Sequence, residues 1–330
     1  MPARPIDLMD MPSRINATAY LNKLKQKWLT LQDTPKVFAY NLNITKSKFL
    51  EGNNHVYTAY NPERTRLRRL PQTITCMRPA FDEDQFNFKK INPLELLLSV
   101  PYESSDISMI INKSPLTKYH TLICPDVAAG QPQCLTRVAL KFSISFLLNI
   151  AEEEEKTFRI GFNSPGALAS VNHLHLHLLH IMPDLYIDNA ELQALSPTNI
   201  FRLSPKMPTE AICFLFKKSN DDVTFNLQLE HLYNFIVWLC DHDIPHNLFM
   251  TPKCSHPFED TLKVFVFARQ EFCYVKDLNT YNIGFCELAG YVTVGDEHLY
   301  ESLTEQEVLA RIKSETGNVY KQQVYEYFVK

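Results

Sequence analysis

Three histidines at every second position are the residues of this sequence best suited to chemistry. They are His173, His175 and His177, in the run His-Leu-His-Leu-His-Leu-Leu. In a β-strand, every second side chain points to the same face of the sheet. A strand over residues 171–181 would therefore align the three imidazoles, roughly 6–7 Å from one to the next, with the intervening leucines in a core.

Aligned imidazoles are suited to nucleophilic attack on phosphorus. Imidazole has an ordinary pKa of about 6.5, so at pH 7 most of it is neutral and has a free nitrogen lone pair. One ring can attack a phosphoanhydride and hold the nucleotide as a phosphoramidate. Its neighbours can donate hydrogen bonds to the phosphoryl oxygens or a proton to the leaving group.

Two other interpretations of the histidines stay open. A His-x-His pair on a strand, with one further ligand, is also a zinc-binding arrangement. The third interpretation is a partly exposed strand whose histidines have no chemical role. Three histidines at a strict period of two are improbable by chance in a chain with 11 histidines among 330 residues, so we favour nucleotidyl or phosphoryl chemistry. We expect His180, which breaks the alternation, to be structural.

Composition narrows the class of protein. A chain of 330 residues is enough for one large or two smaller domains. The formal net charge of −4 argues against a nucleic-acid partner, and no apolar run is long enough for a membrane span. The 8 cysteines include no CxxC pair, which indicates reduced thiols in the cytoplasm and no zinc knuckle. The 8 glycines form no GxGxxG loop, so a nucleotide must be bound by another route.

The pattern of apolar residues predicts an α+β fold with a mostly antiparallel sheet flanked by helices. The predicted helices are 17–31, 135–150, 225–241 and 303–315. The predicted strands are 37–44, 108–112, 120–124, 158–162, 171–181, 211–217, 263–268 and 287–293. The polar, arginine-rich stretch 53–72 is interpreted as a surface loop or extended arm. A proline-rich boundary near 182–208 divides the chain into an N-terminal arm and helix (1–34), a histidine-bearing half (35–190) and a second half (191–330).

The histidine run resembles the motif of the histidine triad superfamily, His-φ-His-φ-His-φ-φ, in which φ is an apolar residue. The stretch 110–125, which contains Ile-Ile-Asn-x-Ser-Pro, resembles the same superfamily. This resemblance implies that the middle histidine, His175, is the nucleophile. It also implies that Asn112 lies at the ribose hydroxyls and that Ser170 contacts phosphate.

The resemblance to the superfamily also implies roles for residues around the nucleophile. His173 and His177 are expected to orient the substrate and neutralise its charge. His120 matches a superfamily position near the nucleotide, although a single histidine on a strand is often structural. Asn163 lies in an Asn-Ser-Pro-Gly turn, where it either contacts ribose or phosphate or only forms the turn.

A closer resemblance is to the GDP-sugar phosphorylases, in the galactose-1-phosphate uridylyltransferase-like branch of the superfamily. It spans about residues 35–315, and it is carried by the stretches 86–90, 110–135, 161–177 and 287–290. The resemblance implies two histidine-triad-like halves, of which only the first is catalytic. It also implies that GDP-D-glucose and inorganic phosphate react to give glucose 1-phosphate and GDP through a guanylylated His175, without a metal or another cofactor.

The resemblance leaves the identity of the hexose open, because GDP-L-galactose and GDP-mannose phosphorylases fit the same motifs. It also leaves hydrolysis open, since related transferases usually have glutamine at the position of His177 and triad hydrolases have histidine there. A non-catalytic nucleotide-binding protein is the third alternative. The sequence does not indicate an oligomeric state.

Overall fold

The structure is a computed structural model that describes residues 15–150, 156–196, 199–253, 258, 260–277 and 280–329. The loose arm expected before the first helix lies almost wholly outside these residues. No helix in the described part of the chain combines the length and the apolar character needed to cross a bilayer.

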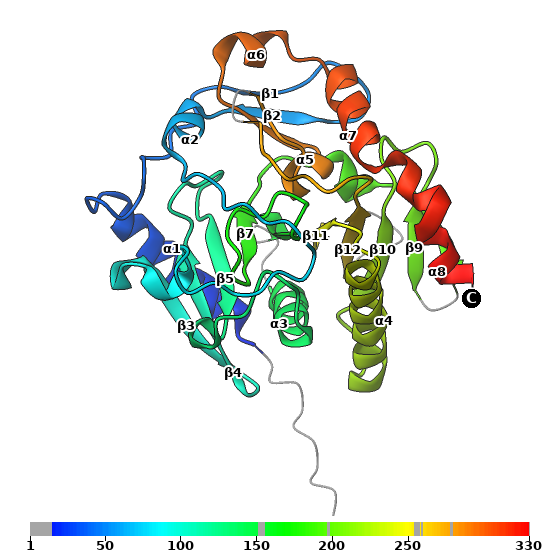
Figure 1. Ribbon diagram of the computed structural model, residues 1–330, viewed down its shortest axis with the longest axis horizontal. Coiled ribbons are helices and arrows are strands. Elements are labelled where there is room, and N and C mark those ends of the chain that lie inside the picture. The colour runs from blue at the N-terminus through cyan, green and yellow to red at the C-terminus, as the bar shows by residue number, and fades with distance from the viewer. Residues whose placement is uncertain are drawn as a thin grey trace, which may run out of the picture.

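A ten-stranded sheet forms the centre of the fold (Figure 1). In spatial order its strands are β3 (Leu96–Tyr102), β4 (Ser105–Ile111), β5 (Thr121–Pro125), β7 (Leu176–His180), β6 (Phe158–Asn163), β11 (His246–Thr251), β12 (Thr261–Ala268), β10 (Ile212–Lys217), β9 (Ile200–Leu203) and β8 (Leu192–Ser196). Every neighbouring pair is antiparallel. The predicted α+β class with an antiparallel sheet is therefore confirmed.

Helices cover one face of this sheet. They are α1 (Ala17–Gln32), α3 (Arg137–Leu148) and α4 (Asp222–Asp241), and their apolar sides join one core with the strands beneath them. Burial on both faces explains why β12 is almost continuously apolar. Val264 and Val266 pack toward the helices, whereas Phe265 and Phe267 pack into the core on the opposite face.

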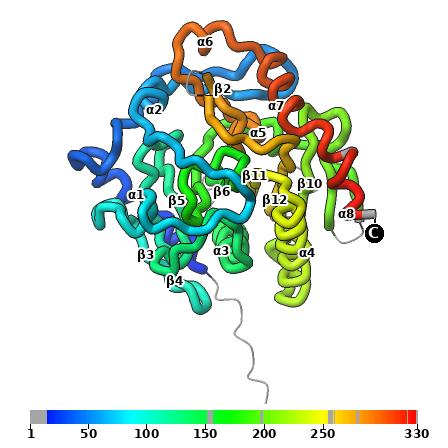
Figure 2. The backbone as a smooth tube through the Cα atoms, in the orientation of Figure 1, coloured from blue at the N-terminus to red at the C-terminus, as the bar shows by residue number. Residues whose placement is uncertain are grey.

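A second layer covers the opposite face of the large sheet. It contains a small sheet of β1 (Ser47–Phe49), β2 (Tyr57–Tyr60) and β13 (Tyr291–Val294), together with α2 (Pro62–Leu67), α5 (Phe285–Leu288), α6 (Glu297–Ser302) and the first part of α7 (Glu305–Val319). The end of α7 and the helix α8 (Tyr325–Val329) pack instead against the core on the first face, where Phe328 contacts Phe235 of α4. β2 pairs with β1 in antiparallel and with β13 in parallel orientation. Figure 2 shows that segments from near the two ends of the sequence lie side by side in this layer, at the top of the view.

The two halves of the large sheet repeat one pattern of connections. Each half contributes three strands, a helix and two further strands: β3–β5, α3 and β6–β7, then β8–β10, α4 and β11–β12. The spatial order of the strands is mirrored about the β6–β11 pair. β12 therefore corresponds to β7, and it has no histidine. We propose that the halves meet at this pair, with the predicted boundary near residue 190 in the connection between them.

Several predicted elements differ from the structure. The four predicted helices are confirmed within a few residues. The predicted strand 37–44 is not formed: residues 37–40 are a turn and bends, with the amide of Val37 donating to the carbonyl of Thr34, and residues 41–44 are irregular. The stretch 53–72 is not a loop, because it contains β2 and α2. The N-cap of α2 is Asn61, whose side chain accepts a hydrogen bond from the amide of Arg64. Residues 287–293 contain the end of α5 before β13 begins.

Candidate active site

Strand β7 begins at Leu176, five residues later than the sequence pattern predicts. The residues before Leu176 do not pair with a neighbouring strand. The amide of Leu174 instead donates a hydrogen bond to the carbonyl of Gln131 at 2.9 Å. As a result, only His177 of the three histidines lies on the strand, and the rings do not form one straight row. The leucines between the histidines are fully buried in the helix-side core, as predicted.

His175 is held in one orientation and one tautomer. Its Nδ1 lies 2.8 Å from the carbonyl oxygen of His173, which can only accept, so Nδ1 carries the proton and Nε2 keeps its lone pair. The amide group of Gln133 accepts the backbone N–H of His175 at 3.0 Å and donates to its carbonyl at 3.1 Å. Burial lowers the pKa of His175 to about 4, so the ring is neutral at pH 7.

A chain of hydrogen bonds fixes the proton of His177. Nδ1 of His120 accepts the amide hydrogen of Leu116 at 3.0 Å, so the neutral His120 ring carries its proton on Nε2. With its proton there, that Nε2 donates to Nδ1 of His177 at 3.0 Å, and it also lies 3.1 Å from Nδ2 of Asn112. Burial lowers the pKa of both rings well below the usual value. His177 therefore has its own proton on Nε2, as a donor for a ligand beside it.

The structure corrects the expected placement of two histidines. His173 does not share the cleft: its ring is buried between Phe81 and Phe88, and its Nδ1 accepts the amide hydrogen of Phe88 at 3.0 Å. What it offers to His175 is its carbonyl oxygen. His120 is also fully buried behind His177, so it positions that ring and does not contact a ligand directly.

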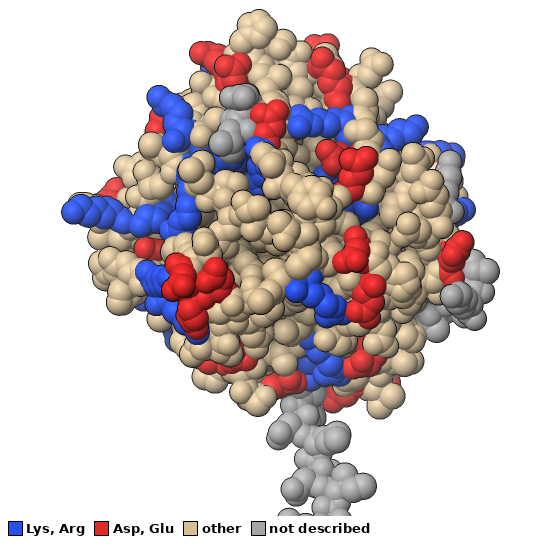
Figure 3. Space-filling view, viewed as in Figure 1, with Lys and Arg blue, Asp and Glu red and all other residues tan. Residues whose placement is uncertain are grey.

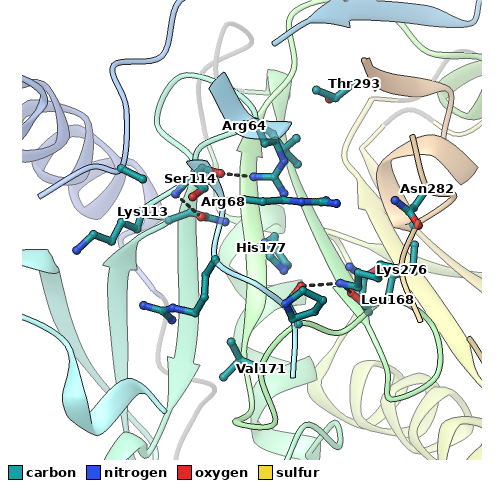
Figure 4. A pocket seen from close by; sticks show the side chains of 18 of the residues that line it. Arg64, Arg68, Lys113, Ser114, Leu168, Val171, His177, Lys276, Asn282 and Thr293 are labelled. Carbon is teal, nitrogen blue, oxygen red and sulfur yellow. Dashed lines mark hydrogen bonds between the residues drawn. The ribbon is translucent and has the colours of Figure 1, made fainter. Parts of the chain in front are cut away.

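His175 and His177 border a cavity of about 630 Å³ between the large sheet and the layer that contains the small sheet. Five cationic residues border it as well: Arg64, Arg68, Arg69, Lys113 and Lys276. In Figure 4 the side chains of Arg64, Arg68 and Lys276 point toward the space beside His177, and Figure 3 shows Lys and Arg side chains gathered around the hollow on this face. The cavity is therefore suited to a polyanionic ligand.

Lys276 lies on one side of the histidines. Its Nζ donates to the carbonyl of Leu168 and to Oγ of Ser170, which leaves its third proton free for a ligand. Burial, together with the charges of Arg68 and Arg64, lowers the pKa of Lys276 to about 7. The cavity also contains the carboxyl of Glu287, whose pKa is raised by burial.

The three predicted substrate-binding residues other than His120 all line the cavity: Asn112, Ser170 and Asn163. Two of them are also part of the frame of the site. Oδ1 of Asn112 accepts the amide hydrogen of Ser114 at 3.0 Å, and Oδ1 of Asn163 accepts from Asn247 at 2.6 Å. Whether they contact substrate stays a prediction.

The loop after β6 has a tightly constrained backbone. Gly166 has φ +69°, and a Cβ there would lie 2.4 Å from the ring of Phe272. Leu168 has φ +74°, a left-handed conformation that is costly for a branched side chain. This conformation directs the carbonyl of Leu168 to Lys276.

Sequence reasoning missed Gln133 and Lys276, and it interpreted Arg64 and Arg68 as residues of a solvated loop. The Asn-Pro-Glu start of α2 is a helix N-terminus signal that would have placed Arg64 on an ordered element. Lys276 follows an irregular segment, and no local pattern distinguishes it from a surface lysine. In the described part of the chain, no group of three or more His, Cys, Asp or Glu side chains is arranged as metal ligands.

Comparison with known proteins shows to which family the chain is similar. Residues 20–179 match the family described as GDPGP1-like, N-terminal domain. The chain is 35% identical over 294 residues to GDP-D-glucose phosphorylase 1 of Danio rerio, covering 86% of this chain and 83% of that protein. It is 35% identical over 292 residues to GDP-D-glucose phosphorylase 1 of Macaca fascicularis, covering 84% and 74%.

The fold is similar to a solved structure. A crystal structure of yeast Ap4A phosphorylase Apa2 superposes with a TM-score of 0.64 at 15% identity, covering 93% of this chain and 99% of that one. That similarity concerns the fold alone, whereas the identity to the vertebrate enzymes extends over most of both chains. The chain therefore belongs to the GDP-D-glucose phosphorylase family.

Proposed function

We propose that this protein catalyses the phosphorolysis of GDP-D-glucose to glucose 1-phosphate and GDP, with His175 as the nucleophile. The observation that carries the proposal is the state of His175: it is neutral, its Nδ1–H is held by a carbonyl, and its Nε2 lone pair is free beside a cationic cavity. The activity in the names of the vertebrate relatives supports it.

In the first step, Nε2 of His175 attacks the α-phosphorus of GDP-glucose. A P–N bond forms as the P–O bond to the β-phosphate breaks, and its electron pair leaves on glucose 1-phosphate. The carbonyl of His173 stabilises the positive charge that the imidazole gains. The N–H of His177 is placed to donate to a phosphoryl oxygen or to the bridging oxygen of the leaving group.

In the second step, inorganic phosphate attacks the same phosphorus. The P–N bond breaks, its electron pair returns to Nε2, and GDP is released. Each step places negative charge beside Arg64, Arg68 and Lys276, which we assign to the diphosphate and to the incoming phosphate. Because the reaction exchanges one P–O bond for another through a phosphoramidate, no redox cofactor is required.

The decisive experiment incubates the protein with GDP-glucose, with and without phosphate, and identifies the products. Phosphorolysis gives GDP and glucose 1-phosphate only when phosphate is present. Release of GMP at the same rate in both conditions would instead assign the protein to the triad hydrolases. No turnover of any GDP-hexose would support a nucleotide-binding protein without activity.

The proposal includes the partners and the setting of the enzyme. Its small-molecule partners are a GDP-hexose and inorganic phosphate, with GDP-glucose favoured over GDP-L-galactose and GDP-mannose by the 35% identity to GDP-D-glucose phosphorylases. None of the described cysteines forms a disulfide. We therefore propose a reducing compartment, the cytoplasm.

A further inference from the structure

The cavity has an apolar end that the chemistry at phosphorus does not use. Paired positions run across four neighbouring strands of the large sheet: Leu96 opposite Ile110, Ile110 opposite Leu122, and Leu122 opposite His177. Directly paired residues point to the same face, so this row leads from the catalytic strand to the edge strand β3, over about 14 Å at the usual strand spacing. That length suits a nucleoside extending away from the α-phosphorus.

The walls of this end are flat and apolar. Phe88, Ile110, Leu122 and Val171 form one small core cluster and line the cavity. Phe88 also contacts the ring of His175, with 5.1 Å between the ring centroids. Polar residues such as Asn282 and Glu287 lie instead toward the Lys276 side, and Figure 4 shows Lys113 and Asn282 on opposite sides of His177. The apolar end therefore suits an aromatic base, and the polar end suits a hexose.

A single carboxylate closes the apolar end. Glu95 is only 7% exposed, lines the cavity and directly precedes β3. Its Oε1 lies 3.4 Å from Nζ of Lys113, and no hydrogen bond to Oε2 is present within the described part of the chain. Arg69, whose guanidinium covers the ring of Phe86 at 3.2 Å from its centroid, adds a second positive charge close to this carboxylate.

We propose that Glu95 selects guanine, with its carboxylate accepting the N1–H and N2–H of the base and with Lys113 donating to O6. This inference rests on the proposed function, because it orients the GDP moiety that the reaction requires. An ionised carboxylate is an acceptor with two oxygens, and guanine presents two adjacent donors beside the O6 acceptor. Adenine presents a lone pair at N1, which the carboxylate would repel, and it has an amino donor in place of the O6 acceptor that Lys113 would bind.

The test is equilibrium binding of GDP, IDP and ADP, measured by titration calorimetry without turnover. IDP lacks only the 2-amino group. The wild-type protein should bind GDP about 10- to 100-fold more tightly than IDP, the range of one well-placed base contact. Glu95→Gln keeps the shape of the side chain and an acceptor for the amide of Asn92, and it should bring the GDP-to-IDP preference close to one.

Two further variants sharpen the test. Lys113→Met should weaken GDP and IDP by the same factor and leave ADP unchanged, because only the first two have O6. Glu103→Gln is the matched control, since it removes a lysine-paired carboxylate near the other end of β3, outside the cavity. It should bind all three nucleotides as the wild type does.

Several results would overturn the proposal. They are an equal loss of all three affinities in Glu95→Gln, a preserved GDP-to-IDP preference in that variant, or no preference in the wild type. The binding and turnover assays separate this inference from the proposed function. A protein that phosphorolyses GDP-glucose but binds GDP and IDP equally refutes only the role of Glu95. A protein that selects GDP through Glu95 but turns nothing over refutes only the activity.

Discussion

Lys276 offers a quantitative test of the electrostatics of the site. Two of its three protons are held by Leu168 and Ser170, so the third is available to the substrate. A hydrogen bond to a charged group contributes about 1.5–3 kcal/mol. Replacing Lys276 with methionine should therefore lower kcat/KM for GDP-glucose by about 10- to 150-fold at pH 6, where the wild-type ammonium is charged.

The pH dependence of kcat/KM provides a second test of the role of Lys276. The pKa of Lys276 in the free enzyme is about 7, so its charge is present below pH 7 and is lost above it. The diphosphate of GDP-glucose keeps a constant charge over this range, and kcat/KM reports on the free enzyme. In the wild type kcat/KM should fall above pH 7, by at most tenfold per pH unit, until it reaches the level of Lys276→Met, and in that variant this limb should be absent.

The control is Lys206→Met, which removes a lysine whose side chain is 82% exposed. It should leave the profile unchanged. Superimposable pH profiles for the wild type and Lys276→Met, or a loss in Lys276→Met below threefold, would show that Lys276 does not bind the substrate as its cation.

Three further predictions concern the frame of the site. Gln133→Leu leaves the backbone N–H and carbonyl of His175 without their partner. It should lower kcat by roughly 10- to 100-fold while circular dichroism shows an intact fold. An unchanged kcat would show that Gln133 does not position His175. Gly161→Ala places a Cβ 2.0 Å from the ring of Phe285, which packs on His177, and should reduce the free energy of unfolding in urea by about 1–3 kcal/mol. Its control, Gly317→Ala in α7, meets nothing closer than 3.9 Å and should stabilise the protein; equal effects at the two sites would contradict the packing argument. Burial holds the pKa of His175 and of His246 at about 4, against about 6.5 in the unfolded chain, so below pH 6.5 the unfolded state binds more protons. The free energy of unfolding should therefore fall between pH 6.5 and 4, by up to about 3 kcal/mol for each of these rings, and less steeply in His246→Asn; parallel curves for that variant and the wild type would refute this assignment.

The sequence was sufficient where local pattern and tertiary structure agree. The period of two around His175 correctly placed the leucines in the core, and the helical periodicity of 225–241 correctly predicted α4. The same period could not show where β7 begins. That depends on Gln133, about forty residues away, which binds the backbone of His175 in place of a neighbouring strand. The expected row of three rings was therefore wrong for His173.

The cationic side of the site depends on long-range assembly. Arg64 reaches the cavity because β2 pairs with β13, more than two hundred residues later, and so positions α2 above the histidines. Lys276 comes from an irregular segment after β12, where neither periodicity nor turn chemistry marks a functional side chain. The sequence did not indicate a binding role for Glu95 for another reason. Glu95 forms a capping box with Asn92, and this structural role is enough to explain a glutamate at that position without a ligand.

The central claim is that Nε2 of His175 carries the nucleotide during turnover. The most direct measurement is mass spectrometry of the protein mixed with GDP-glucose in the absence of phosphate, quenched and digested. We expect one GMP on the peptide that contains His175, removed when phosphate is added and absent from His175→Asn. A wild-type protein that releases GDP and glucose 1-phosphate with phosphate, yet never carries GMP on that peptide, would contradict it.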